Sequence, residues 1–302
     1  MDGHDELARR FEAHRGQLRA VAHRMLGSFE EAEDAVQEAW LRLSRTGGDG
    51  IDNLAGWLTT VVSRICLDLL RSRASRREDP YGQDPRVPAA SDANAPEEAA
   101  VLGDSVSLAL LVVLDRLAPA ERIAFVLHDL FGVPFDRIAQ VVDRSRPAAK
   151  KLASRARQKV RGTPAVPGAD LDRHRQVVEA FLAAARGGDL DGLLEVLAPD
   201  VVRRADPAAL PPGVAPELRG ARAMAEGTVA LRERSRFAVA ALVDGDVGVV
   251  VAPHGRLVLA LTVTVEGERI TAYDVVADPA RLGRLGLGVL DLPEVSARSR
   301  TR

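Results

Sequence analysis

The sequence predicts a multidomain protein in which two all-α domains precede an α+β domain. Apolar residues recur at three- and four-residue spacing, as on one face of a helix, from Glu6 to about Arg77, and a second helical block follows from about Asp104 to Arg161. From Phe237 onward they alternate instead and include many β-branched residues, as in strands. A chain of 302 residues is long enough for each of these parts to bury its own core.

The domain boundaries follow changes in composition. Between residues 78 and 103, four prolines are mixed with Asp, Ala and Gly, a composition that disfavours helix and cannot pack a core. A second Pro- and Gly-rich stretch begins at Gly162. The predicted parts are a helical domain at 1–77, a linker at 78–103, a helical domain at 104–161, a spacer at 162–169, an α+β domain at 170–292 and a disordered tail at 293–302.

The elements follow from periodicity and turn residues. In the first domain, breaks near Gly27 and at Gly47–Gly50 divide the pattern into at least three helices. In the third domain, residues 171–197 predict two helices broken at Gly187. Four strands are expected at 236–243, 246–252, 256–265 and 268–277, separated by Asp244–Gly245, Pro253–Gly255 and Glu266–Gly267.

Composition narrows the class of protein. Lys and Arg (41) nearly cancel Asp and Glu (43), so any nucleic-acid surface must come from local segregation of charge. The single cysteine, Cys66, lies in an apolar run and is expected to be a buried, reduced thiol.

The polar start of the chain lacks the features of a signal peptide. No apolar run approaches the roughly 20 residues that span a bilayer. Both observations predict a cytoplasmic protein without membrane contact.

A helix-turn-helix is predicted near the end of the second domain. Residues 135–142 form a short amphipathic pattern, Asp143–Ser145 are turn residues, and a second helix begins near Ser145, a good N-cap. From Arg144 to Arg161 there are eight basic residues and no acid. The pattern predicts that Ala149, Leu152, Ala156 and Val160 pack inward, and that Arg146, Lys150, Lys151, Ser154 and Arg155 face outward toward a DNA major groove. A solvated basic face is the alternative interpretation.

Two further faces appear in the first domain. Along residues 30–43, Val36, Trp40 and Leu43 form an apolar stripe, and the opposite stripe is acidic and by itself typical of ordinary surface. Residues 54–73 predict a long helix that becomes basic toward its end.

These blocks resemble regions two and four of extracytoplasmic-function sigma factors. The resemblance covers about the first 160 residues and lies in three blocks that occur in the family's order, EDAVQEAWLRL, WLTTVVSRICLDLLR and LAPAERIAFVLHDLFGVPFDRIAQVV. It implies an alternative sigma factor that binds core RNA polymerase and promoter DNA, with the linker threading through polymerase.

The resemblance also implies roles for residues. Asp34, Gln37, Glu38 and Leu41 would dock the β′ clamp helices, and region four would meet the β flap. The segment from Asn53 through Arg64 would melt and read the minus-ten element, and Arg71 and Arg73 would also bind DNA. The residues expected at the minus-thirty-five element are Ser145, Arg146, Lys150, Lys151, Ser154 and Arg155.

The third domain resembles the SnoaL-like, NTF2-like α+β cone that follows region four in one subgroup of these sigma factors. Two motifs of that subgroup have counterparts in Asp206–Leu210 and Asp278–Leu282. The resemblance implies a tethered regulator that replaces a separate anti-sigma protein, with Asp278, Pro279, Arg281 and Leu282 in contact with the linker or sigma domains.

Two other functions stay open at this stage. One is a DNA-binding regulator controlled by a ligand of unknown identity in the cone. The other is an enzyme that uses His254, Asp206, Asp274 and Asp278 as acid and base groups. No catalytic spacing supports the second, so we expect a protein that is not an enzyme and needs no cofactor or metal.

Overall fold

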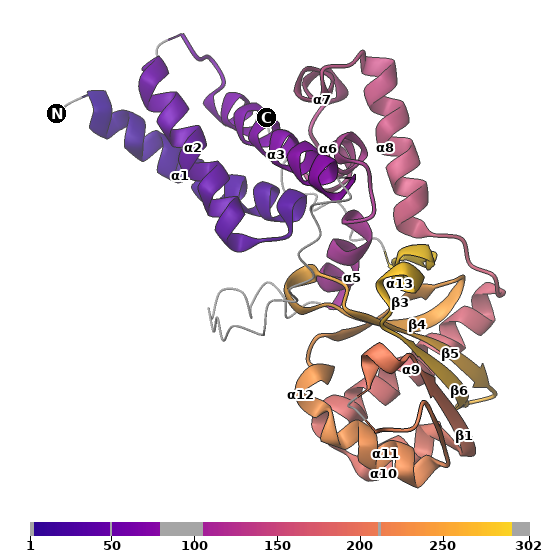
Figure 1. Ribbon diagram of the computed structural model, residues 1–302. Helices are drawn as coiled ribbons and strands as arrows, with labels where there is room; N and C mark the ends of the chain where they lie inside the picture. The colour runs from indigo at the N-terminus through magenta and orange to yellow at the C-terminus, as the bar shows by residue number, and fades with distance from the viewer. Residues whose placement is uncertain (1–2, 49, 79–104, 211–212, 292–302) are drawn as a thin grey trace. The chain divides into compact units, whose positions relative to one another are not determined.

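The computed structural model describes residues 3–48, 50–78, 105–210 and 213–291 (Figure 1). The chain divides into two compact units, one made of residues 1–101, 114–158 and 293–302, the other of residues 102–113 and 159–292. Apart from Glu78, which ends a helix, the expected linker at 78–103 lies outside the described residues, as does the expected tail at 293–302.

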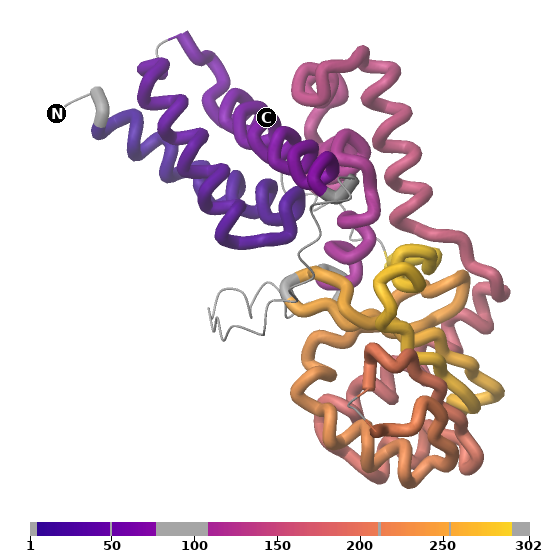
Figure 2. The backbone as a smooth tube through the Cα atoms, in the orientation of Figure 1, coloured from indigo at the N-terminus to yellow at the C-terminus, as the bar shows by residue number. Residues whose placement is uncertain are grey.

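Three long helices pack together at the start of the first unit, as Figures 1 and 2 show: α1 (Gly3–Leu26), α2 (Phe29–Thr46) and α3 (Leu54–Glu78). The predicted breaks are confirmed. The Ser28 hydroxyl accepts a hydrogen bond from the Glu31 N–H at the start of α2, and Gly47, with φ of 81°, ends it. Cys66 is fully buried in this bundle, and burial raises the pKa of its thiol to about 12, which leaves the thiol protonated and unreactive.

The rest of the first unit contains the helix-turn-helix. Its elements are α6 (Pro119–Phe125), a π-helical turn (Val126–Leu130), α7 (Phe135–Val142) and α8 (Arg146–Arg161). The bounds of α7 and α8 confirm the two helices that the sequence predicts. The π-helical turn has no counterpart in the sequence-based prediction.

A seven-stranded sheet forms the centre of the second unit, in the order β2-β1-β6-β5-β4-β3-β7. Its strands are β1 (Leu197–Ala205), β2 (Glu217–Arg219), β3 (Ala238–Val243), β4 (Asp246–Val251), β5 (Leu259–Glu266), β6 (Arg269–Val276) and β7 (Leu287–Gly288). All neighbours whose pairing is described are antiparallel except β1 and β6, which run parallel. The four strands predicted from Phe237 onward are thereby confirmed as β3 to β6.

Helices accompany this sheet. They are α5 (Ser105–Leu114), α9 (Gly168–Gly187), α10 (Leu190–Val196), α11 (Ala221–Ala230), α12 (Arg232–Ser235) and α13 (Pro279–Arg284), with short 3₁₀ turns at Pro207–Ala209 and Pro253–Gly255. The predicted pair of helices broken at Gly187 corresponds to α9 and α10. Phe181 of α9 and Tyr273 of β6 lie in the core with their ring centroids 6.1 Å apart, so α9 is held against the sheet by apolar side chains.

No helix in the described part of the chain is both long enough and apolar enough to cross a membrane.

Candidate nucleic-acid interface

The turn between α7 and α8 is built by two residues. Asp143 ends α7 in the left-handed conformation, with φ of 54° and ψ of 55°, which an aspartate tolerates better than most residues do. The Ser145 hydroxyl accepts a hydrogen bond from the Ala148 N–H, 3.4 Å away, at the start of α8. The two helices therefore meet through a tight turn, as a helix-turn-helix requires.

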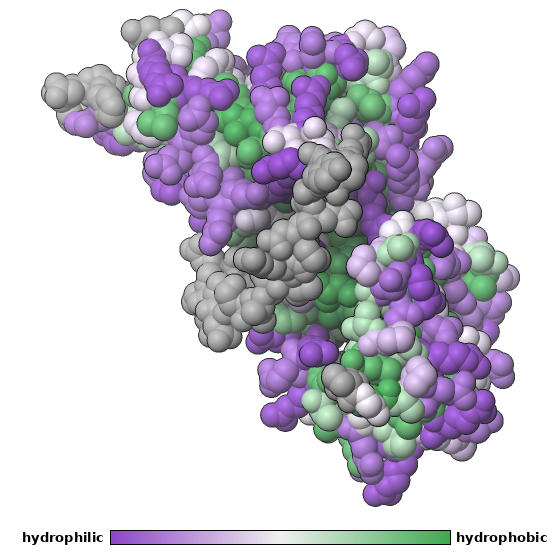
Figure 3. All heavy atoms as spheres, viewed as in Figure 1, coloured by the Kyte–Doolittle hydropathy of each residue, from purple (hydrophilic) through white to green (hydrophobic). Residues whose placement is uncertain are grey.

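The two faces of α8 differ as the sequence predicts. Ala149, Ala156 and Val160 are buried, Leu152 is half-buried, and Ala153 also lies in the buried row. The outward face is polar, and hydrophilic residues gather over it in Figure 3. The side chains predicted to contact DNA are all exposed: Ser145, Arg146, Lys150, Lys151, Ser154 and Arg155.

Acidic side chains from neighbouring elements form ion pairs with two arginines of α8, although α8 itself contains no acid. Arg157 pairs with Asp129 at 2.5 Å, and Arg146 pairs with Asp136 of α7 at 3.3 Å. Arg157 is thus a structural cation, whereas the Arg146 pair is exposed and weak. The Lys150 ammonium group lies over the Phe135 ring of α7, 5.9 Å from its centroid, in a cation–π contact.

Helix α3 and Asn53, which directly precedes it, carry on one stripe three of the four residues of the first domain that are predicted to bind DNA. Asn53, Arg64 and Arg71 are separated by eleven and seven residues, which is close to three and two turns of helix, and all three are exposed. The Asn53 side chain also caps the helix, since its amide oxygen accepts the Gly56 N–H at 2.8 Å. Arg71 lies 3.8 Å from Asp68. This stripe forms the candidate surface of the first domain.

The fourth residue, Arg73, points elsewhere. Its guanidinium donates to the Leu26 carbonyl at 3.1 Å and forms an ion pair with Glu31, which ties α3 to the junction of α1 and α2. Arg73 therefore has a structural role in this arrangement, in addition to any contact with DNA.

The stripe on α3 also meets the helix-turn-helix. The Arg64 guanidinium donates to the Gln140 carbonyl of α7 at 2.9 Å. A Cβ placed on Gly56 would lie 1.8 Å from Nη1 of Arg137, so the Arg137 side chain rests directly on the start of α3. In this structure, part of the candidate surface of α3 is covered by α7.

The acidic stripe of α2 is exposed as predicted. Asp34, Gln37 and Leu41 lie on its outer face, and the Leu41 side chain is 41% exposed. Glu38 is half-buried and forms an ion pair with Arg42 at 2.8 Å.

Arg122 is a buried cation that sequence reasoning did not single out. It is 2% exposed, lies on α6 beside Gly27, and its Nη1 is 3.4 Å from an Asp115 carboxylate oxygen. Burial, opposed by Asp115, lowers the pKa of Arg122 to about 10, so it is charged at neutral pH. The burial of Arg122 could not be predicted locally, because an arginine followed by Ile123 and Ala124 in an amphipathic helix is ordinarily expected on the exposed face.

In the second unit, the structure joins the two motifs that the sequence pairs only by resemblance. The buried Asp206 carboxylate accepts the N–H groups of Ala277 and Asp278, each at 3.0 Å, and forms an ion pair with Arg281. Asp278 itself caps α13 by accepting the Arg281 N–H at 2.8 Å. Leu282 is 7% exposed. Two of the predicted regulatory residues, Asp278 and Arg281, therefore form a clamp on Asp206 within the second unit.

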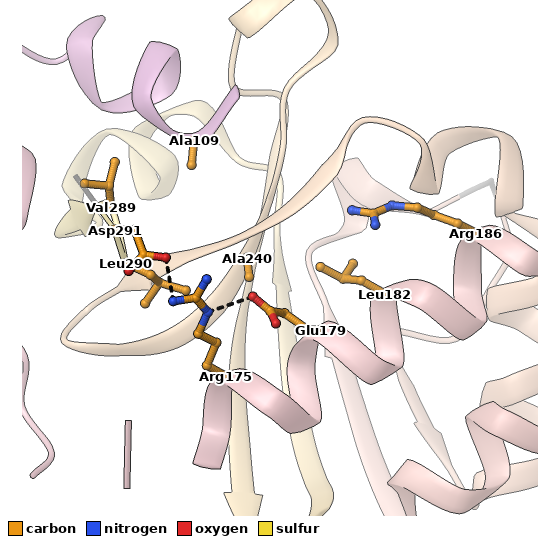
Figure 4. Close-up of a pocket in the computed structure, with 9 residues that line it drawn as sticks. All are labelled: Ala109, Arg175, Glu179, Leu182, Arg186, Ala240, Val289, Leu290 and Asp291. Carbon is orange, nitrogen blue, oxygen red and sulfur yellow. Dashed lines mark hydrogen bonds and ion pairs between the residues drawn. The ribbon is translucent and has the colours of Figure 1, made fainter. Parts of the chain in front are cut away.

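Three of the candidate acid and base groups, Asp206, Asp274 and Asp278, each have a hydrogen-bond or ion-pair partner within the second unit. Asp206 and Asp278 are held in the clamp, Asp274 lies on β6 with Arg204 3.9 Å away, and His254 belongs to the 3₁₀ turn after β4. A separate cavity of about 320 Å³ lies along α9, lined by Ala109, Arg175, Glu179, Leu182, Arg186, Ala240, Val289, Leu290 and Asp291 (Figure 4). Within the described residues, no group of three or more His, Cys, Asp or Glu side chains is placed to hold a metal ion.

Comparison with known proteins identifies the family. Residues 10–76 match the Sigma-70 region 2 family and residues 107–160 match Sigma-70, region 4. The chain is 38% identical over 292 residues to the probable ECF RNA polymerase sigma factor SigI of Mycobacterium tuberculosis, covering 94% of this chain and 98% of that one. It is 42% identical over 246 residues to ECF RNA polymerase sigma factor SigJ of the same species, covering 79% and 78% of the two chains.

Among solved structures, the crystal structure of Mycobacterium tuberculosis SigJ matches 91% of this chain and 98% of that chain, at 35% identity and a TM-score of 0.44. The match to SigI along nearly its whole length includes the α+β domain as well as regions 2 and 4. The chain therefore belongs to the extracytoplasmic-function family of RNA polymerase sigma factors.

Proposed function

We propose that the protein binds core RNA polymerase, directs it to specific promoters, and is modulated by its C-terminal domain in place of a separate anti-sigma protein. The observation that carries the proposal is the helix-turn-helix. One face of its second helix, with Ala149, Ala153 and Ala156, is buried, and the opposite face exposes basic residues: Arg146, Lys150, Lys151 and Arg155. Such a helix suits a major groove. Its role is to contact the minus-thirty-five element.

Region 2 supplies the other two contacts in this proposal. The exposed stripe of Asp34, Gln37 and Leu41 on α2, with Glu38 beside it, docks on the β′ clamp helices. The stripe of Asn53, Arg64 and Arg71 on α3 contacts the minus-ten element. Both roles extend the family resemblance to individual residues, and the exposure of all of these side chains except the half-buried Glu38 supports them.

The experiment is open-complex formation by purified cognate core polymerase with the full-length protein across a library of promoter sequences. Opening that depends on both polymerase and promoter sequence is expected. Replacing Asp34 by Asn should weaken polymerase binding, whereas replacing Glu12 by Gln, an exposed acid on α1, should not. DNA binding without any polymerase-dependent opening would overturn the proposal.

A ligand-controlled DNA-binding regulator is the second candidate, and the cavity along α9 is the observation that favours it. It predicts promoter binding that responds to a small molecule and requires no polymerase. A protein that opens promoters only with core polymerase would exclude it.

A further inference from the structure

The π-helical turn at Val126–Leu130 lies directly before the helix-turn-helix. Turns of this kind are rare and are found frequently at functional sites. Two successive residues of the turn contact the two helices of the motif. The His128 ring packs on Phe135 of α7, with ring centroids 3.9 Å apart, and Asp129 pairs with Arg157 of α8. The turn is therefore attached to both helices at once.

The pair between Asp129 and Arg157 is a close, two-pronged contact. Nε and Nη2 of Arg157 both donate to Oδ1 of Asp129, at 2.7 and 2.5 Å. The Asp129 side chain is 17% exposed, and its other oxygen, Oδ2, is buried with no hydrogen-bond partner among the described residues. Removing Arg157 would leave a largely buried carboxylate without this cation, which is costly.

Arg157 lies on one edge of α8. Arg146, Lys150 and Arg157 follow one another at four and seven residues, which is close to one and two turns of helix. This edge separates the buried alanine row of α8 from the outer face with Ser154 and Arg155. Each of the three cations contacts α7 or the π-helical turn. These contacts fix the rotation of α8 about its own axis within the motif, and with it the direction of the outer face.

We propose that Asp129 and Arg157 are positioning residues for reading the minus-thirty-five element: they hold the rotation of α8 against the π-helical turn and do not bind DNA themselves. This inference rests on the proposed function of α8. Arg157 is one of the eight basic residues from Arg144 to Arg161. Its charge is balanced by Asp129, however, so it does not join the cations that neutralise phosphate.

Asp129→Asn in the full-length protein tests the inference, with Asp136→Asn as the matched control. Each change removes one negative charge from the motif, but Asp136 is exposed and its pair with Arg146 is weak. After circular dichroism shows that each variant is folded, promoter opening with core polymerase is compared between an intact promoter and one with a scrambled minus-thirty-five element. We expect this ratio to fall about fivefold in Asp129→Asn and to stay within about twofold of wild type in Asp136→Asn. Discrimination at the minus-ten element should stay unchanged in both.

Two substitutions of Arg157 separate its charge from its bulk. Arg157→Lys keeps a cation opposite Asp129 but loses the second donor, so we expect it to retain about half of the wild-type ratio. Arg157→Gln loses the cation and should fall as far as Asp129→Asn does. Because the two residues act as one unit, the double variant Asp129→Asn/Arg157→Gln should lose no more than the weaker of the two single variants.

The salt dependence of binding to a nonspecific duplex, followed by fluorescence anisotropy, shows whether Arg157 contacts phosphate. Arg157→Gln should leave the slope of log affinity against log salt unchanged. Arg155→Gln, on the outer face, should reduce the magnitude of that slope by about 0.9. An equal reduction in Arg157→Gln would overturn the inference and place Arg157 among the residues that bind DNA.

Two further results would also contradict the inference. One is an unchanged minus-thirty-five ratio in Asp129→Asn. The other is an equal loss at both promoter elements, which indicates general damage rather than a changed direction of α8. If the wild-type protein opens no promoter, the proposed function fails instead, and the salt dependence still decides whether Arg157 binds phosphate.

Discussion

Asp206 shows how one carboxylate organises two distant motifs. Burial alone would raise its pKa, but hydrogen bonds from Asp278 and Ala277 and the charge of Arg281 outweigh that effect, so the pKa of Asp206 is lowered. A carboxyl group whose pKa is lower in the folded state stabilises the fold above its unfolded pKa, near 4, and loses this contribution as pH falls through the folded value.

We therefore expect Asp206→Asn to reduce the free energy of unfolding by about 1–3 kcal/mol at pH 7. The difference from wild type should shrink as the pH falls below about 4, where the wild-type carboxylate becomes protonated. Urea unfolding at several pH values measures this. Asp274→Asn, which alters a half-exposed acid of the same sheet, serves as the control. A difference that stays constant with pH would show that charge is not the cause.

Arg122 gives a second prediction for a single residue. Its partner Asp115 has a side chain that is 40% exposed and can be solvated again, so the volume of Arg122 matters more than its charge. Arg122→Met should change the free energy of unfolding by less than about 1 kcal/mol, whereas Arg122→Ala should reduce it by about 2–4 kcal/mol through the cavity it leaves. Equal losses in urea unfolding of the two variants would assign the effect to charge instead.

The partners of individual charged side chains were harder to predict from the sequence than whether those side chains are exposed. The outward face of α8 and the acidic stripe of α2 follow from helical periodicity, and the structure confirms their exposure. The engagement of Arg73 with Glu31 and of Arg157 with Asp129 could not be predicted, because each pair joins residues of different elements that the local pattern does not connect.

At the scale of elements, the strong periodic segments were predictable and the weak strands were not. Helices α1 to α3, α7 and α8 and strands β3 to β6 agree with the sequence pattern. Strand β1 was missed because Pro199 and Asp200 interrupt it and because its parallel partner β6 lies about 70 residues away, with a register shift between them. Strands β2 and β7 are too short for alternation to be visible.

The pairing of β4 with β5 leads to a prediction about packing. A Cβ on Gly248 would lie 2.4 Å from the Leu261 carbonyl oxygen, which is backbone and cannot rotate away. Gly248→Ala should reduce the free energy of unfolding by about 1–3 kcal/mol. Gly227→Ala, in open space on α11, should instead increase it by about 0.5–1 kcal/mol. Thermal unfolding of both variants checks the contrast, and similar melting temperatures would contradict it.

At the scale of the whole molecule, the domain bounds drawn from composition shifts remain a prediction, and by its contacts the chain groups residues 102–113 with residues 159–292. The sequence places α5 with region 4 because it precedes α6 without a break in apolar character, yet its partners lie in the C-terminal unit. Contacts between segments far apart in sequence decide that assignment, and no local pattern records them. In the first unit, the same kind of contact brings α7 onto α3.

The contact between α3 and α7 can be tested without changing a residue predicted to touch DNA. Arg137→Ala removes the side chain that covers Gly56. We expect the variant to bind nonspecific duplex DNA several-fold, about 3- to 10-fold, more tightly than wild type in the absence of polymerase, because a larger fraction of molecules exposes α3. Fluorescence anisotropy measures this, with Gly16→Ala, a change in open space on α1, as the control. Weaker binding by Arg137→Ala would assign that arginine to the DNA surface.

The hydrogen bond from Arg64 to the Gln140 carbonyl also bears on how such a protein searches a genome. Competing nonspecific sites number in the millions, and a permanently bare cationic helix would spend most of its time on them. In the proposed function, partial cover of α3 by α7 makes the free protein less readily sequestered by bulk DNA. We then expect this contact to open when polymerase and promoter are engaged, so that the protein meets polymerase first and promoter DNA second.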